Sequence, residues 1–289
     1  CLNFDGLMNH LHVSPFVQDA TFIMVDQEIS AFVDGLKTAK TMLLQNADHL
    51  LDVALGGTAV GTGVNTPKGY LDVMETVLPE VTGAPFRVKN NKFQGLALKD
   101  AFMMAHGALN TLATTLFKIA NDVRFLGSGP RCGYGEWHLP ENEPGSSIMP
   151  GKVNPVIPEV MNQVAYKVIG NDLCVTMSGE AAQMELNAME PVMAQCCFES
   201  ADLLMNGFDT LRTLCVDGIT ANEEKCRRDV HNSIGVVTAL NPVIGYKNST
   251  KIAKEALETG KGVYELVLEH NILSKKDLDT ILKPENMIK

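Results

Sequence analysis

Four long segments of this 289-residue chain place apolar residues on a seven-residue beat. In the first segment, from Asp19 to about Asn46, two rows keep the beat: Phe22, Ile29, Leu36 and Leu43, and Val25, Phe32 and Ala39. This spacing puts both rows on one side of an α-helix, whereas a half-buried strand would alternate every second residue. The segment therefore predicts one long amphipathic helix.

The same beat returns in segments that run from about Leu98 to Leu126, from near Val156 to about Val175, and from Pro191 to Cys215. Long helices with this period pack side by side at shallow angles, and strand signals are nearly absent. The chain is therefore predicted to be all-α, an elongated bundle of long helices with a small C-terminal helical domain. Helices this long expose apolar surface unless other subunits cover it, so we expect an oligomer.

The pattern of apolar residues changes near Asp217-Gly218, because long seven-residue repeats precede this point and shorter helical segments follow it. We take this point as a domain boundary. The run Thr220-Ala221-Asn222-Glu223 is typical of a capping box, and shorter helices are expected over about 222–233, 250–258 and 274–282, with breaks at Asn241-Pro242 and Gly245. The expected divisions are an atypical N-terminal segment over 1–17, a central helical-bundle domain over 18–217 and a small helical domain over 218–289.

Composition excludes several classes of protein. The net charge of −10 argues against a nucleic-acid or anionic-membrane partner, and no apolar run reaches the length that spans a bilayer. The seven cysteines form no CxxC pair and several lie in apolar runs, as expected of core thiols in a reducing compartment. No signal-peptide pattern is evident, so a cytoplasmic location is expected.

Two glycine-containing loops leave alternatives open. The loop over 56–65 lacks the Gly-Lys-Ser/Thr ending of a P-loop, and Leu50 to Leu55 is expected to continue a helix, so nucleotide binding is disfavoured. Backbone packing at a helix junction is the leading interpretation, and lining an active site is the other. In the loop over 128–133, Arg131 is either a surface charge or an anion clamp.

A third loop, over 144–155, carries the most chemistry. It places two hydroxyls, a cation and an amide within ten residues, on Ser146, Ser147, Lys152 and Asn154. Pro155 is suited to the start of the next helix, whose free N–H groups and positive dipole end would lie nearby. The loop is either a receptor for a carboxylate or a solvated surface loop. Glu159, one turn inside the helix, either orients a partner acid or base or favours the helix N-terminus by its charge.

The remaining candidates are weaker. His10 and His12 form an HxH pair without a further ligand at metal spacing, so no metal is expected. His106 is interpreted as a packed or capping histidine, and Trp137 with His138 either lines a cleft or anchors a loop. No Gly-x-Ser-x-Gly elbow occurs, which disfavours a Ser-His-Asp hydrolase.

The segment GSSIMPGKVNP over 145–155 resembles the signature of the aspartase/fumarase superfamily. GTAVGTGVN over 57–65 and SGPRCG over 128–133 resemble further blocks of it, and the resemblance extends from about Gln18 to the C-terminus. Within the superfamily, the run from Val153, LNAMEP over 186–191 and GITAN over 218–222 are most similar to the aspartate ammonia-lyases. Fumarases usually carry Phe and a basic residue where Met189 and Glu190 stand.

The resemblance implies conversion of L-aspartate to fumarate and ammonia without an organic cofactor. It makes Ser146 the base that removes the C3 proton, Lys152 and Asn154 the ligands of a substrate carboxylate, and Ser147 a further contact. Glu159 matches an acidic residue that pairs with a polar side chain of another motif. Because a serine is a poor base, its alkoxide would need backbone N–H groups and Lys152 in a loop closed to water. The resemblance also implies a homotetramer whose active sites combine blocks from three subunits.

The chain departs from the family pattern near its start. Of the block Gly-Arg-Thr-x-Leu-Gln-Asp-Ala only Gln18-Asp19-Ala20 match, and Ser14, Pro15 and Phe16 occupy the Arg, Thr and His/Gln positions. Pro15 and Phe16 cannot replace the hydrogen bonds of a Thr and a His or Gln to substrate. We therefore expect a truncated or altered form that is inactive alone. The alternatives are a fumarate hydratase of the same superfamily and a non-catalytic helical assembly subunit.

Overall fold

The computed structural model describes residues 10–12 and 22–287. The four predicted long helices are present as α1 (Val25–Ala47), α4 (Asp100–Leu126), α5 (Val156–Glu180) and α6 (Glu190–Leu214). The other helices are α2 (Tyr70–Thr82), α3 (Lys92–Ala97), α7 (Glu223–Asn232), α8 (Val237–Ile244), α9 (Tyr246–Thr259), α10 (Val263–Glu269), α11 (Lys275–Ile281) and α12 (Pro284–Met287). The prediction of an all-α protein is confirmed, since the strands of the described part have only two or three residues and pair two by two.

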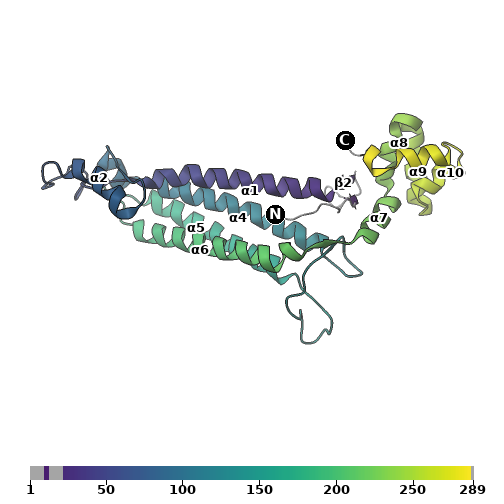
Figure 1. Cartoon of the computed structure of the whole chain (residues 1–289), viewed down its shortest axis with the longest axis horizontal. Helices are drawn as coiled ribbons and strands as arrows, with labels where there is room; N and C mark the ends of the chain where they lie inside the picture. The colour runs from purple at the N-terminus through teal and green to yellow at the C-terminus, as the bar shows by residue number, and fades with distance from the viewer. Residues whose placement is uncertain (1–9, 13–21, 288–289) are drawn as a thin grey trace. The chain divides into compact units, whose positions relative to one another are not determined.

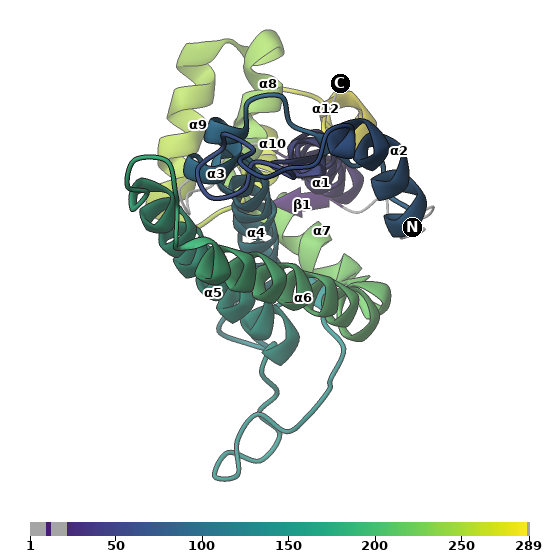
Figure 2. The same ribbon diagram turned by 90° about the vertical axis from the view of Figure 1, so that its left-hand side faces the viewer.

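The chain divides into two compact units, one made of residues 32–124 and 141–215 and the other of residues 1–31, 125–140 and 216–289. In the first of these, which we call the bundle unit, α1, α4, α5 and α6 run side by side (Figures 1 and 2). Phe32 of α1 lies against Lys118 of α4, and Asn121 of α4 accepts a hydrogen bond from Asn162 of α5, so successive neighbours are antiparallel. The long helices are therefore joined along their length, as the seven-residue beat predicts.

The predicted apolar rows form the core of the bundle unit. The α5 row Met161, Val168 and Val175 is fully buried, and Leu204 and Leu211 of α6 are buried. Large apolar side chains remain exposed on the outer faces of these helices: Tyr166, Leu173 and Met177 on α5, and Phe198, Met205 and the row residue Phe208 on α6. One copy of the chain therefore leaves the apolar outer faces of α5 and α6 open.

A polar network crosses the interior of the bundle unit. His106 of α4 is fully buried, with Nδ1 2.8 Å from Asp172 Oδ1 and Nε2 2.9 Å from Ser200 Oγ. The Asn171 amide donates to Ser200 Oγ and to Glu199. Ser200 Oγ, which accepts from Asn171, thus lies within hydrogen-bond distance of His106 Nε2, and Asp172 Oδ1 lies within hydrogen-bond distance of Nδ1. The network thereby ties α4, α5 and α6 together, and His106 is a packed histidine, as predicted.

The structure corrects several predicted boundaries. The first helix begins at Val25 instead of Asp19, because Phe22–Met24 forms strand β2, which pairs antiparallel with β1 (His10–His12). Residues 50–55 do not continue that helix: a 3₁₀ turn (Asp48–Leu51) leads into β3 (Asp52–Val53), which pairs in parallel with β4 (Arg87–Val88). The N-terminal positions 13–21, with Ser14, Pro15 and Phe16, lie outside the described residues.

The predicted break at Asn241-Pro242 is also wrong. Pro242 lies inside α8, whose Leu240 and Ile244 are buried in the C-terminal core, so packing outweighs the hydrogen bond that the proline removes. The break falls instead at Gly245, which has a positive φ of 76° and lets α9 begin at Tyr246, four residues before the predicted start.

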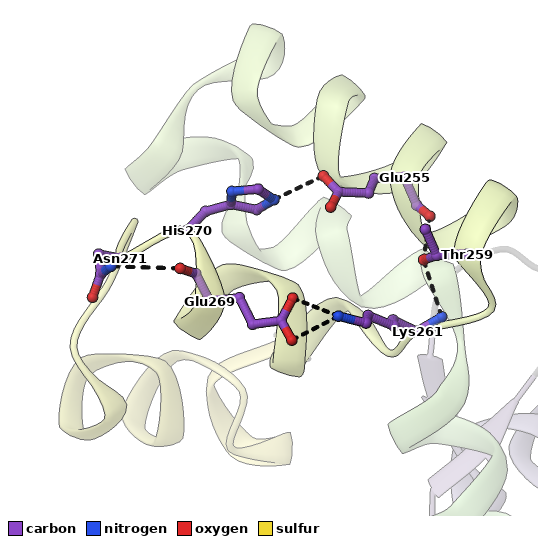
Figure 3. Close-up of polar contacts among 6 residues, drawn as sticks. All are labelled: Glu255, Thr259, Lys261, Glu269, His270 and Asn271. Carbon is purple, nitrogen blue, oxygen red and sulfur yellow. Dashed lines mark hydrogen bonds and ion pairs between the residues drawn. The ribbon is translucent and has the colours of Figure 1, made fainter.

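Helices α7 to α12 belong to the second unit, with strands β5 (Trp137–His138) and β6 (Thr220–Ala221). Their apolar core includes Leu240, Ile252, Leu266 and Leu278, all fully buried. Polar contacts tie α9 and the connection after it to the end of α10. Lys261, in the connection, holds both carboxylate oxygens of Glu269 at 2.7 and 2.8 Å, and His270 Nε2, just after α10, lies 2.8 Å from Glu255 of α9 (Figure 3). The helix predicted from about residue 222 is confirmed, since Asn222 caps α7 by accepting from the Lys225 N–H. The capping box itself is wrong, because Thr220 lies in strand β6 and Asn222 takes the place of the N-cap.

The described cysteines are all free thiols, as predicted. Burial raises the pKa of Cys196, Cys197 and Cys215 to about 11, so these thiols stay protonated at neutral pH. No described helix is long and apolar enough to cross a membrane.

Candidate functional site

The loop over residues 144–155 closes on itself as a narrow turn. Pro144 and Val153 pair as an antiparallel bridge, and the Gly145 N–H donates to Lys152 O at 2.7 Å. Asn154 Nδ2 donates to Gly145 O at 3.2 Å. We call these two hydrogen bonds the loop clasp. The clasp brings the two ends of the loop together at the start of α5.

Ser146 lies just inside the clasp. Its Oγ accepts a hydrogen bond from the Ile148 N–H at 3.3 Å, and the residue is half-buried. A backbone donor on this oxygen favours the alkoxide form of the serine, which is the form a base would need. The structure therefore places one backbone donor on Ser146 Oγ, as the predicted role of a base would require.

The other two predicted ligands of the loop face solvent. Ser147 and Lys152 are exposed, and Lys152 makes no ion pair in the part of the chain that the structure describes. Ile148 is 84% exposed at the loop tip, although it is apolar. The loop thus exposes both the ammonium group of Lys152 and the apolar side chain of Ile148 to solvent. Such exposure is typical of a loop that binds a ligand or a partner.

The start of α5 offers fewer free N–H groups than the sequence indicates. The Val156 N–H donates to Asn154 O at 2.9 Å, and Pro158 has no N–H. The first helical bond, from Glu159 to Pro155 O, is 3.2 Å long. Ile157 is left as the donor of the first turn, so the loop side chains have to carry most of the binding of an anion.

Glu159 pairs with a residue that the sequence reasoning missed. Arg124 of α4 lies 3.5 Å from the Glu159 carboxylate, and one turn away Asn162 donates to Asn121 at 2.7 Å. Both pairs fix the first turns of α5 against α4. A polar residue near the end of a helix carries no signal of its partner, so only the fold identifies Arg124.

The loop clasp predicts the effect of replacing Gly145 by alanine. A Cβ at this position would lie 2.8 Å from Asn154 Oδ1 and 2.9 Å from its backbone N, so Asn154 must move and the clasp must open. We expect faster exchange of the backbone amide at position 145, which donates to Lys152 O, and a free energy of unfolding lowered by about 1–3 kcal/mol. The control is Gly170→Ala, whose added Cβ meets no atom within 4 Å. Unchanged exchange in Gly145→Ala would contradict the clasp.

The glycine-rich loop over 56–65 lies at the opposite end of the bundle unit (Figure 1). An added Cβ on Gly57 would touch Lys92 and Leu96 of α3, and Leu96 O accepts from Asn187, which follows the C-terminal end of α5. These contacts agree with the interpretation of backbone packing at a helix junction. At 1.5 Å per residue, the length of α5 separates the two loops by roughly 40 Å.

The remaining candidates do not add to the loop over 144–155. Arg131 is exposed on a turn in which Ser128 Oγ accepts from the Tyr134 N–H, and Trp137 is buried, as an anchor would be. Glu190, where fumarases usually have a basic residue, pairs with Lys99 at 3.2 Å. Among the described residues, no group of His, Cys, Asp and Glu has the arrangement of a metal site.

Comparison with known proteins agrees with this geometry. The family model described as "Lyase" matches residues 15–170, and that described as "Fumarase C C-terminus" matches residues 236–289. The chain is 50% identical over 273 residues to the aspartate ammonia-lyase of Pseudomonas aeruginosa and 48% identical over 272 residues to that of Escherichia coli. Each match covers 94% of this chain but only 58% and 57% of those relatives. The chain belongs to the aspartase/fumarase superfamily of lyases.

Solved structures show the same fold. A class II fumarase from Schistosoma mansoni matches with a TM-score of 0.91 at 35% identity, over 96% of this chain and 61% of that one. A fumarate lyase:delta crystallin from Brucella melitensis, bound to cobalt, matches with a TM-score of 0.91 at 42% identity, over 96% of this chain and 60% of that one. The chain thus spans a little over half of the length of the proteins that it matches.

Proposed function

We propose that this chain supplies the loop over residues 144–155, which we call the serine loop, to an aspartate ammonia-lyase, an enzyme that converts L-aspartate to fumarate and ammonia. Ser146 removes the C3 proton, Lys152 and Asn154 hold a carboxylate, Ser147 makes a further contact, and Glu159 supports the loop through the start of α5. The observation that carries the proposal is the loop itself: Ser146 Oγ accepts a backbone N–H, and Lys152 is exposed beside it. The identity to aspartate ammonia-lyases supports the choice of substrate.

The proposal includes a homotetramer with composite active sites. The loops over 56–65 and 144–155 lie at opposite ends of the bundle unit, so a site that uses both blocks must take them from different copies. The apolar outer faces of α5 and α6 offer the surface for such an assembly. Light scattering should give four times the mass of the chain, and a stable monomer would contradict the assembly. We also propose that the protein lies in the cytoplasm. Its proposed divisions are an N-terminal segment over 1–17, a central helical-bundle domain over 18–217 and a C-terminal domain over 218–289.

A chimera tests the activity. It joins residues 18–289 of this chain to the N-terminal part of the Escherichia coli relative, so that the relative's own residues replace Pro15 and Phe16, and fumarate is followed by its ultraviolet absorbance. Turnover of L-aspartate is expected, with little dehydration of L-malate. The chain by itself should give little or no fumarate, because orientation of a substrate can contribute roughly 7–11 kcal/mol and Pro15 and Phe16 do not supply the family's contacts. A folded chimera that prefers L-malate would establish the fumarate hydratase alternative.

A further inference from the structure

Outside the loop over 144–155, one carboxyl oxygen is buried without a hydrogen-bond partner among the described residues. Glu136, which precedes β5, is 2% exposed, and its Oε2 has no hydrogen-bond partner in the described part of the chain. Its backbone is fully engaged: the N–H donates to Leu126 O at 2.9 Å, and the carbonyl accepts from the Asn222 N–H at 2.7 Å. These backbone bonds hold the segment that carries the buried side chain against the residues before it and against the start of α7.

The groups that face Glu136 do not neutralise a negative charge on it. Asp229 and Lys225 face it from α7, and Glu28 faces it from α1. Lys225 is already paired with Asp229, and Arg228 lies 3.9 Å from that same carboxylate. The Cys226 thiol is directed at the carbonyl of Glu136, not at its carboxyl group. An ionised Glu136 would therefore face the carboxylates of Asp229 and Glu28 and the ammonium of Lys225, which is already paired with Asp229.

A proton is the species that can neutralise Glu136. No set of described side chains around it has the arrangement of a metal site. Burial, followed by the charges of Asp229 and Glu28, raises the pKa of Glu136 to about 7, and Lys225 opposes this shift only in part. The carboxyl group is thus protonated in mildly acidic solution and ionised in alkaline solution.

We propose that Glu136 is a proton-operated latch that fastens the β5–β6 pair and the start of α7. In the protonated state the neutral side chain stays buried, and the bonds from Asn222 to Glu136 and Gly135 hold α7 in place. Ionisation of Glu136 puts a negative charge beside Asp229 and Glu28. The repulsion is reduced when the bonds from Asn222 to Glu136 and Gly135 open and water reaches the carboxylate. The latch does not depend on the proposed lyase activity.

The direction of the effect follows from linkage. The folded pKa lies above the ordinary value of 4.5, so the stabilisation is complete below about pH 4.5 and is lost as the pH rises through about 7. Over that interval the equilibrium constant for closure of the latch should fall by about 300-fold, and it should level off above it.

Hydrogen exchange on the intact chain tests the latch. After correction for the intrinsic exchange rate, protection of the Asn222 and Cys226 amides should fall by about 70-fold between roughly pH 5 and pH 8. Glu136→Gln keeps a neutral side chain of the same size, so its protection should be nearly independent of pH. The control Glu141→Gln, at an exposed carboxylate, should behave as the parent does. Equal pH dependence in Glu136→Gln and the parent would overturn the proposal.

A second variant keeps the test decisive. Asp229→Asn removes a charge that disfavours ionisation of Glu136, so the midpoint of the loss of protection should move to lower pH. A midpoint that stays where it is in the parent would contradict the latch, whatever Glu136→Gln does to folding.

Discussion

Replacement of His106 by leucine should lower the free energy of unfolding by about 2–5 kcal/mol, although leucine is apolar and similar in size. The ring is fully buried and holds Asp172 and Ser200, so its loss leaves a carboxylate and a hydroxyl without their partner inside the bundle unit. Asp172 keeps one hydrogen bond, from Asn110 at 2.7 Å, which limits the loss of stability. Urea unfolding at fixed protein concentration measures the difference.

The matched control for His106→Leu is His138→Leu, at an exposed histidine, which should change the stability by no more than about 0.5 kcal/mol. A double-mutant cycle of His106→Leu with Ser200→Ala should give a coupling of about 0.5–3 kcal/mol. Equal stabilities of the two histidine variants, or additive effects in the cycle, would show that the network does not fasten α4 to α6.

Replacement of Ser146 by alanine should reduce turnover of L-aspartate by the chimera by at least about 10²–10³-fold while leaving the fold intact. The alanine has no oxygen to take the C3 proton, and the Ile148 N–H loses its acceptor. Ser147→Ala removes a neighbouring hydroxyl that serves only as a contact, so it should raise KM more than it lowers kcat. Stopped assays with circular dichroism on the same samples check both activity and folding.

Two results would contradict these roles. Near-full activity in Ser146→Ala would exclude this serine as the base. Equal losses in kcat from Ser146→Ala and Ser147→Ala would show that the loop tolerates no change and that neither hydroxyl has a distinct role.

The sequence predicts the long helices because their apolar rows are read directly from spacing. Met161, Val168 and Val175 are buried where the beat places them, and Asn222 begins α7 and Gly260 ends α9 as capping chemistry requires. Spacing fails where tertiary packing decides, as at Pro242 inside α8 and at Phe22–Met24, which pairs as a strand although it keeps the beat.

The serine loop could be found from the sequence, because its residues lie within twelve positions and resemble a long family signature. Its partners could not. Arg124 meets Glu159, and Glu136 meets Asp229, only because distant segments are folded together. Asn154 was predicted to bind substrate, yet in the structure one of its amide N–H groups is used by Gly145 O, a contact that no spacing rule predicts.

Restoration of a disabled relative is the most direct test of the claim that this chain contributes its serine loop to a composite site. The chain is refolded together with the Escherichia coli aspartate ammonia-lyase in which the serine aligned with Ser146 is alanine, and native mass spectrometry confirms mixed oligomers. The mixture should form fumarate from L-aspartate, whereas a mixture made with the Ser146→Ala chain should not. Mixed oligomers that form no more fumarate with Ser146 than with alanine at this position would contradict the account.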